Sequence, residues 1–310
     1  MHCVILAGGA GTRFWPKSRR KRPKQLLNLI NNRSLVTETT QRLEKTSVCE
    51  AVYIVASKEL FPLIQDEIPH IPEQHFFVEP SGRNTAPAIA LAAFILQKRV
   101  GDVVMGVFPA DHLIRKEKQF QRSLVEAQAK AETGPNLITL GIQPTRPATG
   151  YGYVQFSRDD DADIHPVIRF TEKPDLETAK QFLENGDHLW NGGMFVWKVS
   201  TLLDNIARHL PTTYKRLAGI EHLIDTPDFL PALEKIWPQV DSISIDYGVL
   251  ENAESIFTVE TRFAWNDLGS WRTLYDELHK DKAGNVALGD VTLLDVRNSL
   301  VLSEGRYTAA

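Results

Sequence analysis

Cysteine is scarce in this sequence, with Cys3 and Cys49 the only two among 310 residues. Two thiols are too few for a disulfide framework or for a zinc site built from cysteines, and such scarcity favours a reducing compartment. We therefore expect two inert, buried cysteines in a cytoplasmic protein.

Long hydrophobic runs are also missing. The best run, residues 86–96, is about half of the roughly 20 residues that a membrane-spanning helix needs. The N-terminal residues 2–7 are apolar but lack the basic residues that precede the apolar region of a signal peptide. They are interpreted as a first strand, and no membrane association is expected.

Excess charge of either sign is absent as well. The 35 Lys and Arg nearly balance the 39 Asp and Glu, which gives a formal charge of -4. The protein as a whole therefore has no positive electrostatic field that would attract nucleic acid. The hydrophobic content of 43% and the charged content of 24% are typical of a globular chain with a sizeable core. Any anion site must therefore be local.

Short apolar runs alternate with helix-length segments in the first half of the chain. The expected strands are residues 3–7, 51–56, 75–78, 103–108 and 137–140, and the expected helices are residues 34–45, 85–98 and 118–132. This alternation predicts the α/β class, with a mostly parallel, Rossmann-like sheet covered by helices on both faces. In such sheets ligands bind beyond the carboxyl ends of the strands.

The alternation of expected strands and helices changes after residue 150. Residues 151–156 and 166–171 are typical of a hairpin-type insertion, and residues 194–199 of a further strand. The aspartates in the hairpin lack the spacing and the glycine of a cation-binding loop, so a solvated turn is expected for Asp159, Asp160, Asp161 and Asp163. We expect one catalytic domain over 1–280, followed by a short β-rich tail over 281–310 that resembles the start of a further β domain.

Glycines follow the first expected strand directly, in the run Leu6-Ala7-Gly8-Gly9-Ala10-Gly11-Thr12-Arg13. Without side chains, such a loop can turn its backbone N–H groups toward a polyphosphate. It lacks the third glycine of the dinucleotide fingerprint and the Gly-Lys-Ser/Thr of the ATPase loop. Residues 13–24 contain no acidic residue, which favours an anion site over a glycine turn beside a solvated basic face.

These residues resemble the signature of the sugar-1-phosphate nucleotidyltransferases. The Arg-Phe-Trp-Pro-Lys-Ser-Arg form is similar to the branch that transfers GMP to mannose-1-phosphate. Further motifs of this branch are found in the expected order at residues 77–88, 109–112, 170–174, 190–195 and 265–271. The resemblance covers about residues 2–280 and implies the nucleotidyltransferase fold, GTP and mannose-1-phosphate as substrates, and Mg²⁺ as cofactor.

The resemblance also implies roles for individual residues. Arg13 and Lys24 are the expected catalytic residues, and Asp111 and Asp267 the expected metal ligands. The expected nucleotide-binding residues are Leu6, Ala7, Gly8, Gly9, Gly11, Thr12, Arg13, Glu79, Pro80, Arg83, Asn84 and Thr85. The expected sugar-phosphate-binding residues are Gly150, Glu172, Lys173 and Asn191.

The chemistry of the reaction suits these residue types. A sugar-phosphate oxygen attacks the α-phosphorus of GTP and pyrophosphate leaves, so the site must gather two polyanions. The attacking phosphate is already ionised near pH 7 and needs no general base, which favours magnesium ligation over acid–base roles for Asp111 and Asp267.

Structural alternatives remain for the candidates: Arg13 would also be explained as a solvated arginine, and Asn191 as a turn contact. Turn or cap roles would explain the two aspartates, helix capping would explain Asn84 or Thr85, and an exposed salt bridge would explain Glu172 with Lys173.

Two alternative functions also remain at this point. One is the same chemistry on another sugar-1-phosphate or another nucleotide, because epimer preference depends on one or two hydrogen bonds. The other is a nucleotide-sugar sensor without turnover, against which the presence of both Asp111 and Asp267 argues. The tail of longer family members supports oligomer contacts, so a homodimer is among the expected assemblies.

Overall fold

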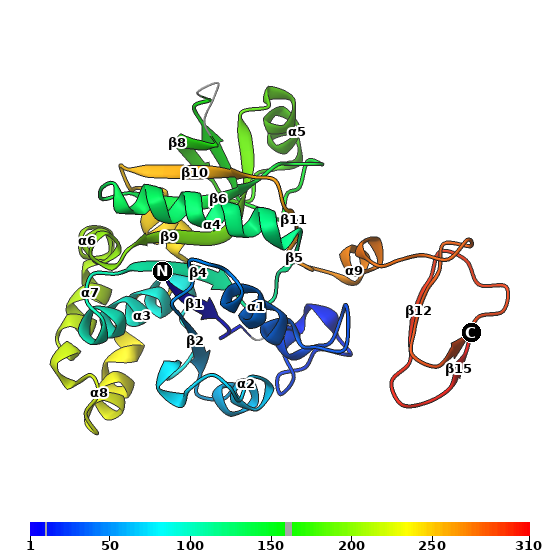
Figure 1. Ribbon diagram of the computed structural model, residues 1–310, viewed down its shortest axis with the longest axis horizontal. Helices are drawn as coiled ribbons and strands as arrows, with labels where there is room; N and C mark the ends of the chain where they lie inside the picture. Colours follow the sequence, from blue (N-terminus) through cyan, green and yellow to red (C-terminus); the bar gives the residue numbers. More distant parts are fainter. Residues whose placement is uncertain (10, 159–162) are drawn as a thin grey trace.

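A nine-stranded sheet forms the centre of the protein in the computed structural model, which describes residues 1–9, 11–158 and 163–310 (Figure 1). The strand order is β3-β2-β1-β4-β9-β6-β10-β8-β7. Its strands are β1 (His2–Leu6), β2 (Ala51–Ser57), β3 (Phe76–Glu79), β4 (Val104–Pro109), β6 (Leu137–Ile142), β7 (Tyr153–Phe156), β8 (Ile164–Thr171), β9 (His188–Lys198) and β10 (Ile256–Thr261).

The α/β class is confirmed, but the sheet is mixed rather than mostly parallel. Strands β1 to β4 pair in parallel, as do β6 and β10, whereas β9 runs antiparallel to both β4 and β6. The chain between β6 and β9 is taken up by the β7–β8 hairpin and by α5 (Leu176–Asn185). Strand β9 therefore enters the sheet at the end where β6 leaves it, with Trp190 beside Ile142.

Helices cover both faces of the sheet. The remaining α-helices are α1 (Leu35–Glu44), α2 (Phe61–Glu67), α3 (Thr85–Arg99), α4 (Glu117–Glu132), α6 (Val199–His209), α7 (Pro211–Ala218), α8 (Phe229–Ile236) and α9 (Trp271–Glu277). Alternate residues of β1 enter different cores: Val4 packs with α3 and α6, while Cys3 and Ile5 pack with α1 and α4. This is the two-residue period of a strand buried on both sides.

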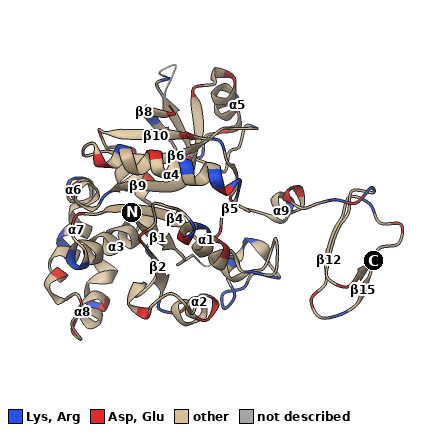
Figure 2. Ribbon diagram, in the orientation of Figure 1, with Lys and Arg blue, Asp and Glu red and all other residues tan. Residues whose placement is uncertain are grey.

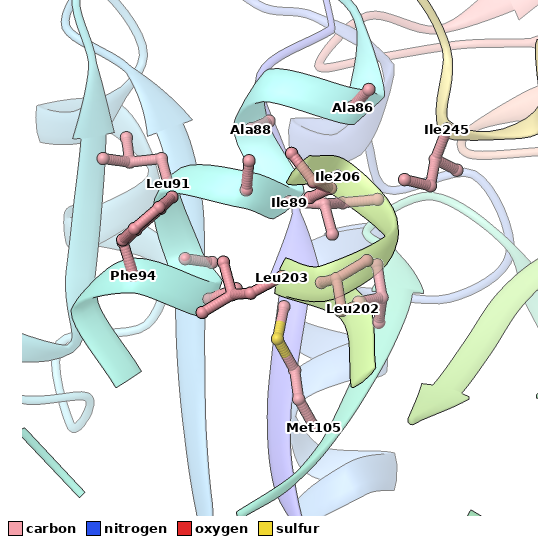
Figure 3. Close-up of a cluster of buried hydrophobic side chains, with 14 of the residues drawn as sticks. Ala86, Ala88, Ile89, Leu91, Phe94, Met105, Leu202, Leu203, Ile206 and Ile245 are labelled. Atoms are coloured by element: carbon pink, nitrogen blue, oxygen red, sulfur yellow. The ribbon is translucent and has the colours of Figure 1, made fainter. Parts of the chain in front are cut away.

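Helix α3 is buried along residues 86–96. Figure 3 shows Ile89 of α3 beside Ile206 and Leu202 of α6, in the same cluster as Met105 of β4. The helix begins with Asn84 as its N-cap, whose Oδ1 accepts a 2.9 Å hydrogen bond from the Thr85 amide. Its burial fixes the position of the loop between β3 and α3, which belongs to the site described below.

Charged residues are spread over the surface, and Lys and Arg concentrate along the loop after β1 (Figure 2). In the hairpin, Asp159 to Asp161 lie outside the described residues. Asp163 is ion-paired with Arg122 and Arg262, each at 3.0 Å. Cys3 is buried and Cys49 half-buried, both as free thiols. None of the helices in the described part of the chain has the length and apolar character needed to span a bilayer.

The tail beyond α9 projects away from the sheet (Figure 1). It forms two parallel pairs, β12 (Val286–Leu288) with β14 (Leu300–Leu302) and β13 (Val291–Thr292) with β15 (Thr308–Ala309). The expected short strands are therefore present, and the domain boundary at residue 280 stays a prediction.

The C-terminal part of the chain supports the basic loop after β1. The Trp271 indole N–H donates a 3.0 Å hydrogen bond to the Trp15 carbonyl, and its ring meets Phe14 edge-on. Glu304 of the tail forms a 2.8 Å ion pair with Lys17. The loop is thus packed against residues that lie more than 250 positions later in the sequence.

Candidate active site

A cavity of about 1040 Å³ opens at the carboxyl ends of β1 to β4. It is lined by most of the residues that the sequence predicts, namely Leu6, Ala7, Gly8, Gly9, Gly11, Thr12, Arg13, Lys24, Glu79, Pro80, Asn84, Thr85 and Asp111. Arg83, Gly150, Glu172, Lys173, Asn191 and Asp267 are not on its wall. The position of the cavity follows the rule for ligand sites in α/β sheets.

The glycine loop is held by its carbonyl groups. The Gln25 amide donates hydrogen bonds to the carbonyls of Ala7 (2.7 Å) and Gly9 (2.9 Å). Gly11 has a φ of +48°, and a Cβ there would lie 2.5 Å from the Lys24 backbone nitrogen. A glycine is therefore required at position 11 by both conformation and space. Gln25 directly follows the basic run of residues 13–24, and the sequence pattern alone predicts no role for it.

Lys24 joins the two aspartates that the sequence predicts as metal ligands. Its ammonium group is only 3% exposed, lies 2.7 Å from Oδ2 of Asp111, and donates to the backbone carbonyl of Asp267. Burial has the largest single effect and would raise the pKa of Asp111, but the charges of Lys24, His112 and Arg13 and the hydrogen bond from Lys24 together outweigh it, so the pKa is lowered. Arg13 lies 4.0 Å from Oδ2 of Asp267.

A small ribbon brings these aspartates together. Strand β5 (Leu113–Arg115) pairs antiparallel with β11 (Ala264–Asn266), so that Asn266 lies beside Leu113. Asp111 lies two residues before β5, and Asp267 directly follows β11. No local sequence pattern predicts it, because it joins segments about 150 residues apart.

The donor set of Asp111 and Asp267 fits Mg²⁺. The Asp111 carboxylate and the backbone carbonyl of Asp267 both contact the Lys24 ammonium group, and Oδ2 of the Asp267 carboxylate lies 4.0 Å from Arg13, so both residues lie beside cationic groups. Mg²⁺ is commonly held by one or two carboxylates together with substrate phosphates. Within the described ranges no group of three or more His, Cys, Asp or Glu residues could hold a metal.

Two aromatic residues orient the groups beside this position. Tyr151 donates a 2.9 Å hydrogen bond to Oδ1 of Asp267, which also accepts from the Gly269 amide at 3.1 Å. The Trp265 indole N–H donates to Nδ1 of His112 at 3.1 Å. Burial lowers the pKa of His112 to about 4, so the ring is neutral and its proton is on Nε2. Sequence reasoning missed Tyr151 and His112, although both lie in motifs that it quoted or directly beside them.

Glu79 is a buried carboxylate in the wall of the cavity. It is 3% exposed, and its Oε2 has no hydrogen-bond partner among the described residues. Burial raises the pKa of Glu79 to about 7. One of its oxygens lies so close to Gly8 that any Cβ at position 8 would collide with it. A buried acceptor without a partner is costly unless a ligand supplies the donor.

The predicted sugar side is more dispersed. Glu172 forms an ion pair with Lys173 and packs behind Gly152. Asn191 contacts Gly152 as well, and its amide donates to the Gly152 carbonyl, whereas Gly150 is exposed and has open space around its Cα. The structure thus brings Glu172 and Asn191 together at Gly152, with Lys173 paired to Glu172, and shows no contact that would assign a role to Gly150.

Backbone strain coincides with the motifs. Of the seven non-glycine residues with positive φ in the described chain, three fall in predicted site segments: Asn84 (+69°), Lys173 (+44°) and Leu268 (+45°). Residues are held in such conformations when the surrounding structure requires them, and they cluster at functional sites.

The family model described as "Nucleotidyl transferase" matches residues 2–284. The chain belongs to the nucleotidyl transferase family. Membership confirms the expected fold and the expected class of enzyme, a nucleotidyltransferase.

This nucleotidyltransferase is similar in sequence to several named bacterial proteins. It is 36% identical over 315 residues to a mannose-1-phosphate guanylyltransferase of Escherichia coli, covering 99% of this chain and 68% of the relative. It is also 36% identical to the alginate biosynthesis protein AlgA of Pseudomonas syringae pv. tomato, covering 99% of this chain and 64% of the relative. The nucleotidyltransferase chain therefore spans about two thirds of the length of these relatives.

Solved structures agree with this assignment of the fold. A structure from Thermus thermophilus, described as a mannose-1-phosphate geranyltransferase, superposes with a TM-score of 0.88 at 31% identity, covering 100% of this chain and 89% of that one. A Helicobacter pylori structure described as a mannose-6-phosphate isomerase superposes with a TM-score of 0.70 at 27% identity, covering 86% of this chain and 98% of that one.

Proposed function

We propose that this nucleotidyltransferase transfers GMP from GTP to mannose-1-phosphate and releases pyrophosphate, with GDP-mannose as the product. The observation that carries the proposal is the single cavity that joins the glycine loop, the Lys24–Asp111 pair and the buried carboxylate of Glu79. The names of the relatives from Escherichia coli and other bacteria support the choice of substrates.

The glycine loop and two cations suit the triphosphate. Gln25 engages the loop carbonyls, which leaves the N–H groups of Gly8, Gly9, Gly11 and Thr12 available to phosphate oxygens. Lys24 is fixed by its two acceptors, while the Arg13 side chain is 68% exposed and free to move toward the ligand. Fixed donors near the α-phosphorus stabilise the charge that develops in the transition state.

Glu79 suits guanine better than adenine. An ionised carboxylate can accept from both N1–H and the 2-amino group of guanine, whereas adenine has no proton on N1. With adenine, the buried Glu79 carboxylate would keep an unsatisfied oxygen, so the wrong base carries a penalty. Asn84 and Thr85 line the same part of the cavity.

Asp111 and Asp267 would hold Mg²⁺. When bound, Mg²⁺ neutralises phosphate charge and stabilises the in-line transition state. Lys24 and Arg13 lie beside these two aspartates and would contact the same phosphates, while the hydrogen bond from Tyr151 would fix the orientation of Asp267. No residue is needed as a general base, because the attacking phosphate carries no proton near pH 7.

The decisive experiment measures pyrophosphate release from GTP and from ATP with a panel of sugar-1-phosphates. We expect release with GTP and mannose-1-phosphate, with kcat/KM for GTP at least tenfold above that for ATP. Preferred turnover of another sugar or of ATP would change the substrate assignment and leave the reaction class intact. Binding of GDP-mannose without release from any pair would favour the non-catalytic sensor.

The proposal also covers the cellular location and the assembly of the enzyme. A cytoplasmic location fits the two free thiols and the nature of the substrates. A homodimer is proposed from the oligomer contacts that the tail supports in longer family members, and sedimentation of the purified chain tests it.

A further inference from the structure

The loop between β3 and α3, residues 80–84, forms part of the cavity wall but has no helix or strand of its own. The residues of this loop that line the cavity beside Glu79 are Pro80, Ser81, Gly82 and Asn84. Most of the loop is exposed, so burial of its own side chains does not hold it in place. The burial of α3 fixes the end of the loop, but the position of residues 80–83 must come from contacts with other segments.

Trp237 ties this loop to the helices that pack around α3. It begins the short 3-10 helix η5 (Trp237–Gln239), directly after α8, and its side chain is fully buried. Its indole N–H donates a 2.6 Å hydrogen bond to the Ser81 carbonyl. A buried N–H needs a partner, and here the partner is a backbone group of the cavity wall.

A second hydrogen bond reaches the loop from the same segment. The Arg83 guanidinium donates to the Val240 carbonyl at 3.5 Å, while the Val240 amide donates to the Trp237 carbonyl at 3.3 Å. Within the described chain, no other hydrogen bond joins residues 80–83 to a distant segment. Trp237 supplies the shorter of the two and is therefore the main tether of the loop.

The segment after Val240 continues along the start of α3. The Ala86 amide donates to the Ile243 carbonyl at 3.1 Å, and the Ile245 amide donates to the Thr85 hydroxyl at 2.8 Å. Figure 3 shows Ile245 near Ala86, at the first turn of α3. Residues 237–245 thus contact residues 81–86 by hydrogen bonds along their whole length, and we call them the brace.

The brace is itself anchored to α7 through Asp241. The Thr213 hydroxyl donates a 2.7 Å hydrogen bond to Oδ2 of Asp241 and accepts a 3.0 Å hydrogen bond from the Asp241 amide. Thr213 lies in α7 and is fully buried. A chain of specific contacts therefore runs from α7 through the brace to the cavity wall.

A second buried tryptophan shows how Trp237 differs from an ordinary core residue. Trp197 of β9 is fully buried in the same hydrophobic cluster, but its indole N–H has no hydrogen-bond partner among the described residues. Packing of the ring in the core is common to both residues. The hydrogen bond to Ser81 belongs to Trp237 alone, so Trp197 is a matched control.

We propose that Trp237 is a positioning residue for the nucleotide, because its hydrogen bond to the Ser81 carbonyl holds the loop of residues 80–84 where a base can pack against Glu79. Residues 237–244 are not on the described wall of the cavity, so they act on the nucleotide only through this loop. The inference deepens the proposed function and rests on it for the identity of the base.

The test compares Trp237→Phe with Trp197→Phe. Both substitutions shorten a buried ring in the same core, but only Trp237→Phe removes a hydrogen bond. In Trp237→Phe the KM for GTP should rise about 3- to 10-fold, while kcat and the KM for mannose-1-phosphate should change less than about twofold. In Trp197→Phe all three should stay within about twofold of the wild type. Equal effects of the two substitutions on the KM for GTP would overturn the proposal.

Base selectivity gives a readout that a purely structural role would not move. GTP gains from Glu79 only when the loop holds the base in place, so the ratio of kcat/KM for GTP to that for ATP should fall at least about threefold in Trp237→Phe. The ratio should be unchanged in Trp197→Phe. An unchanged ratio in Trp237→Phe would show that the hydrogen bond does not position the base. If Trp237→Phe does not fold, benzothienylalanine at position 237 keeps the ring size, replaces the N–H by sulfur and takes its place.

Failure of the proposed function would be distinguishable from failure of this inference. If the wild-type chain releases no pyrophosphate with any pair of substrates, the reaction assignment fails. Amide hydrogen exchange of residues 81–86 and calorimetric titration of GTP still test the tether. Faster exchange and weaker binding in Trp237→Phe, but not in Trp197→Phe, would support it. Identical exchange and affinity in the two variants would refute it.

Discussion

The Tyr151 hydroxyl donates a 2.9 Å hydrogen bond to Oδ1 of Asp267, an oxygen that the Gly269 amide also contacts at 3.1 Å. One oxygen of this carboxylate is therefore occupied by the protein. The other, Oδ2, faces Arg13 and is the one available to a cation. A hydrogen bond of this kind fixes the orientation of a metal-binding carboxylate.

Tyr151→Phe should weaken divalent metal binding by about 10- to 100-fold, because Asp267 loses the donor that orients it. The measurement is Mn²⁺ binding by electron paramagnetic resonance in the presence of GTP, alongside activity. Tyr153→Phe removes a nearby buried hydroxyl that accepts from the Ala148 amide and does not touch the site, so it is the control. Equal Mn²⁺ affinities in both variants and the wild type would contradict the role of Tyr151.

Asp111→Asn and Asp267→Asn should each lower turnover by a factor of at least about 1,000 while the protein stays folded. The amide keeps the shape of the side chain but removes the charge that Mg²⁺ requires. Pyrophosphate release is measured over a range of Mg²⁺ concentrations, and thermal unfolding checks the fold. Wild-type turnover in either folded variant would exclude that residue as a ligand.

Glu79 should make the stability of the ligand-free protein depend on pH. Its pKa is about 7 in the folded protein, against a usual value of 4.5. Between these values the folded state holds a proton that the unfolded state has released. Proton binding by Glu79 therefore stabilises the folded protein fully below about pH 4.5. This stabilisation is lost as the pH rises through about 7.

The matching experiment compares wild-type protein with Glu79→Gln, which cannot titrate. Urea unfolding at about pH 5 and about pH 8 should reveal an extra loss of up to about 3 kcal/mol in the wild type on going to the higher pH. Parallel pH profiles of the two proteins would exclude a raised pKa at Glu79.

Gly11→Ala should destabilise the protein by about 1–3 kcal/mol and raise the KM for GTP, because the φ of +48° and the nearby Lys24 backbone leave no room for a Cβ. Gly134→Ala is the control, since a Cβ there makes ordinary contacts with Asn136. Denaturant unfolding and GTP titration give the two readouts. If Gly11→Ala is as stable as Gly134→Ala, the loop can adjust to accommodate a Cβ at position 11, which contradicts the prediction.

Local sequence patterns were sufficient for much of the fold. The run 103–108 forms β4 at Val104–Pro109, and the helix expected at 85–98 is α3 at Thr85–Arg99, because burial and capping are encoded by neighbouring residues. The direction of β9 was not predictable in this way. It depends on which end of the sheet the chain reaches after the hairpin and α5, and this is decided by long-range packing.

The same limit applies to the candidate site. Glycines after a strand and a buried Glu79 are readable from order along the chain, and the structure brings them to one cavity. Trp237 lies in a segment without any local signature, and its hydrogen bond to the Ser81 carbonyl spans 156 residues of sequence. The hydrogen bond from Tyr151 to Asp267 spans 116 residues and is equally invisible to pattern analysis. The roles of these residues stay predictions.

The support of the basic loop by Trp271 has a consequence for biosynthesis. The loop that follows the first strand is made at the start of translation, yet the residue that packs on Phe14 and binds the Trp15 carbonyl is made 256 positions later. Lys24 can likewise donate to the Asp267 carbonyl only after Asp267 has been synthesised. A growing chain can form its early strands in order of synthesis, but its phosphate-binding loop gains these contacts only after almost the whole family domain has left the ribosome. Nascent fragments that end before residue 267 therefore lack the partners that hold Lys24 and the loop in place.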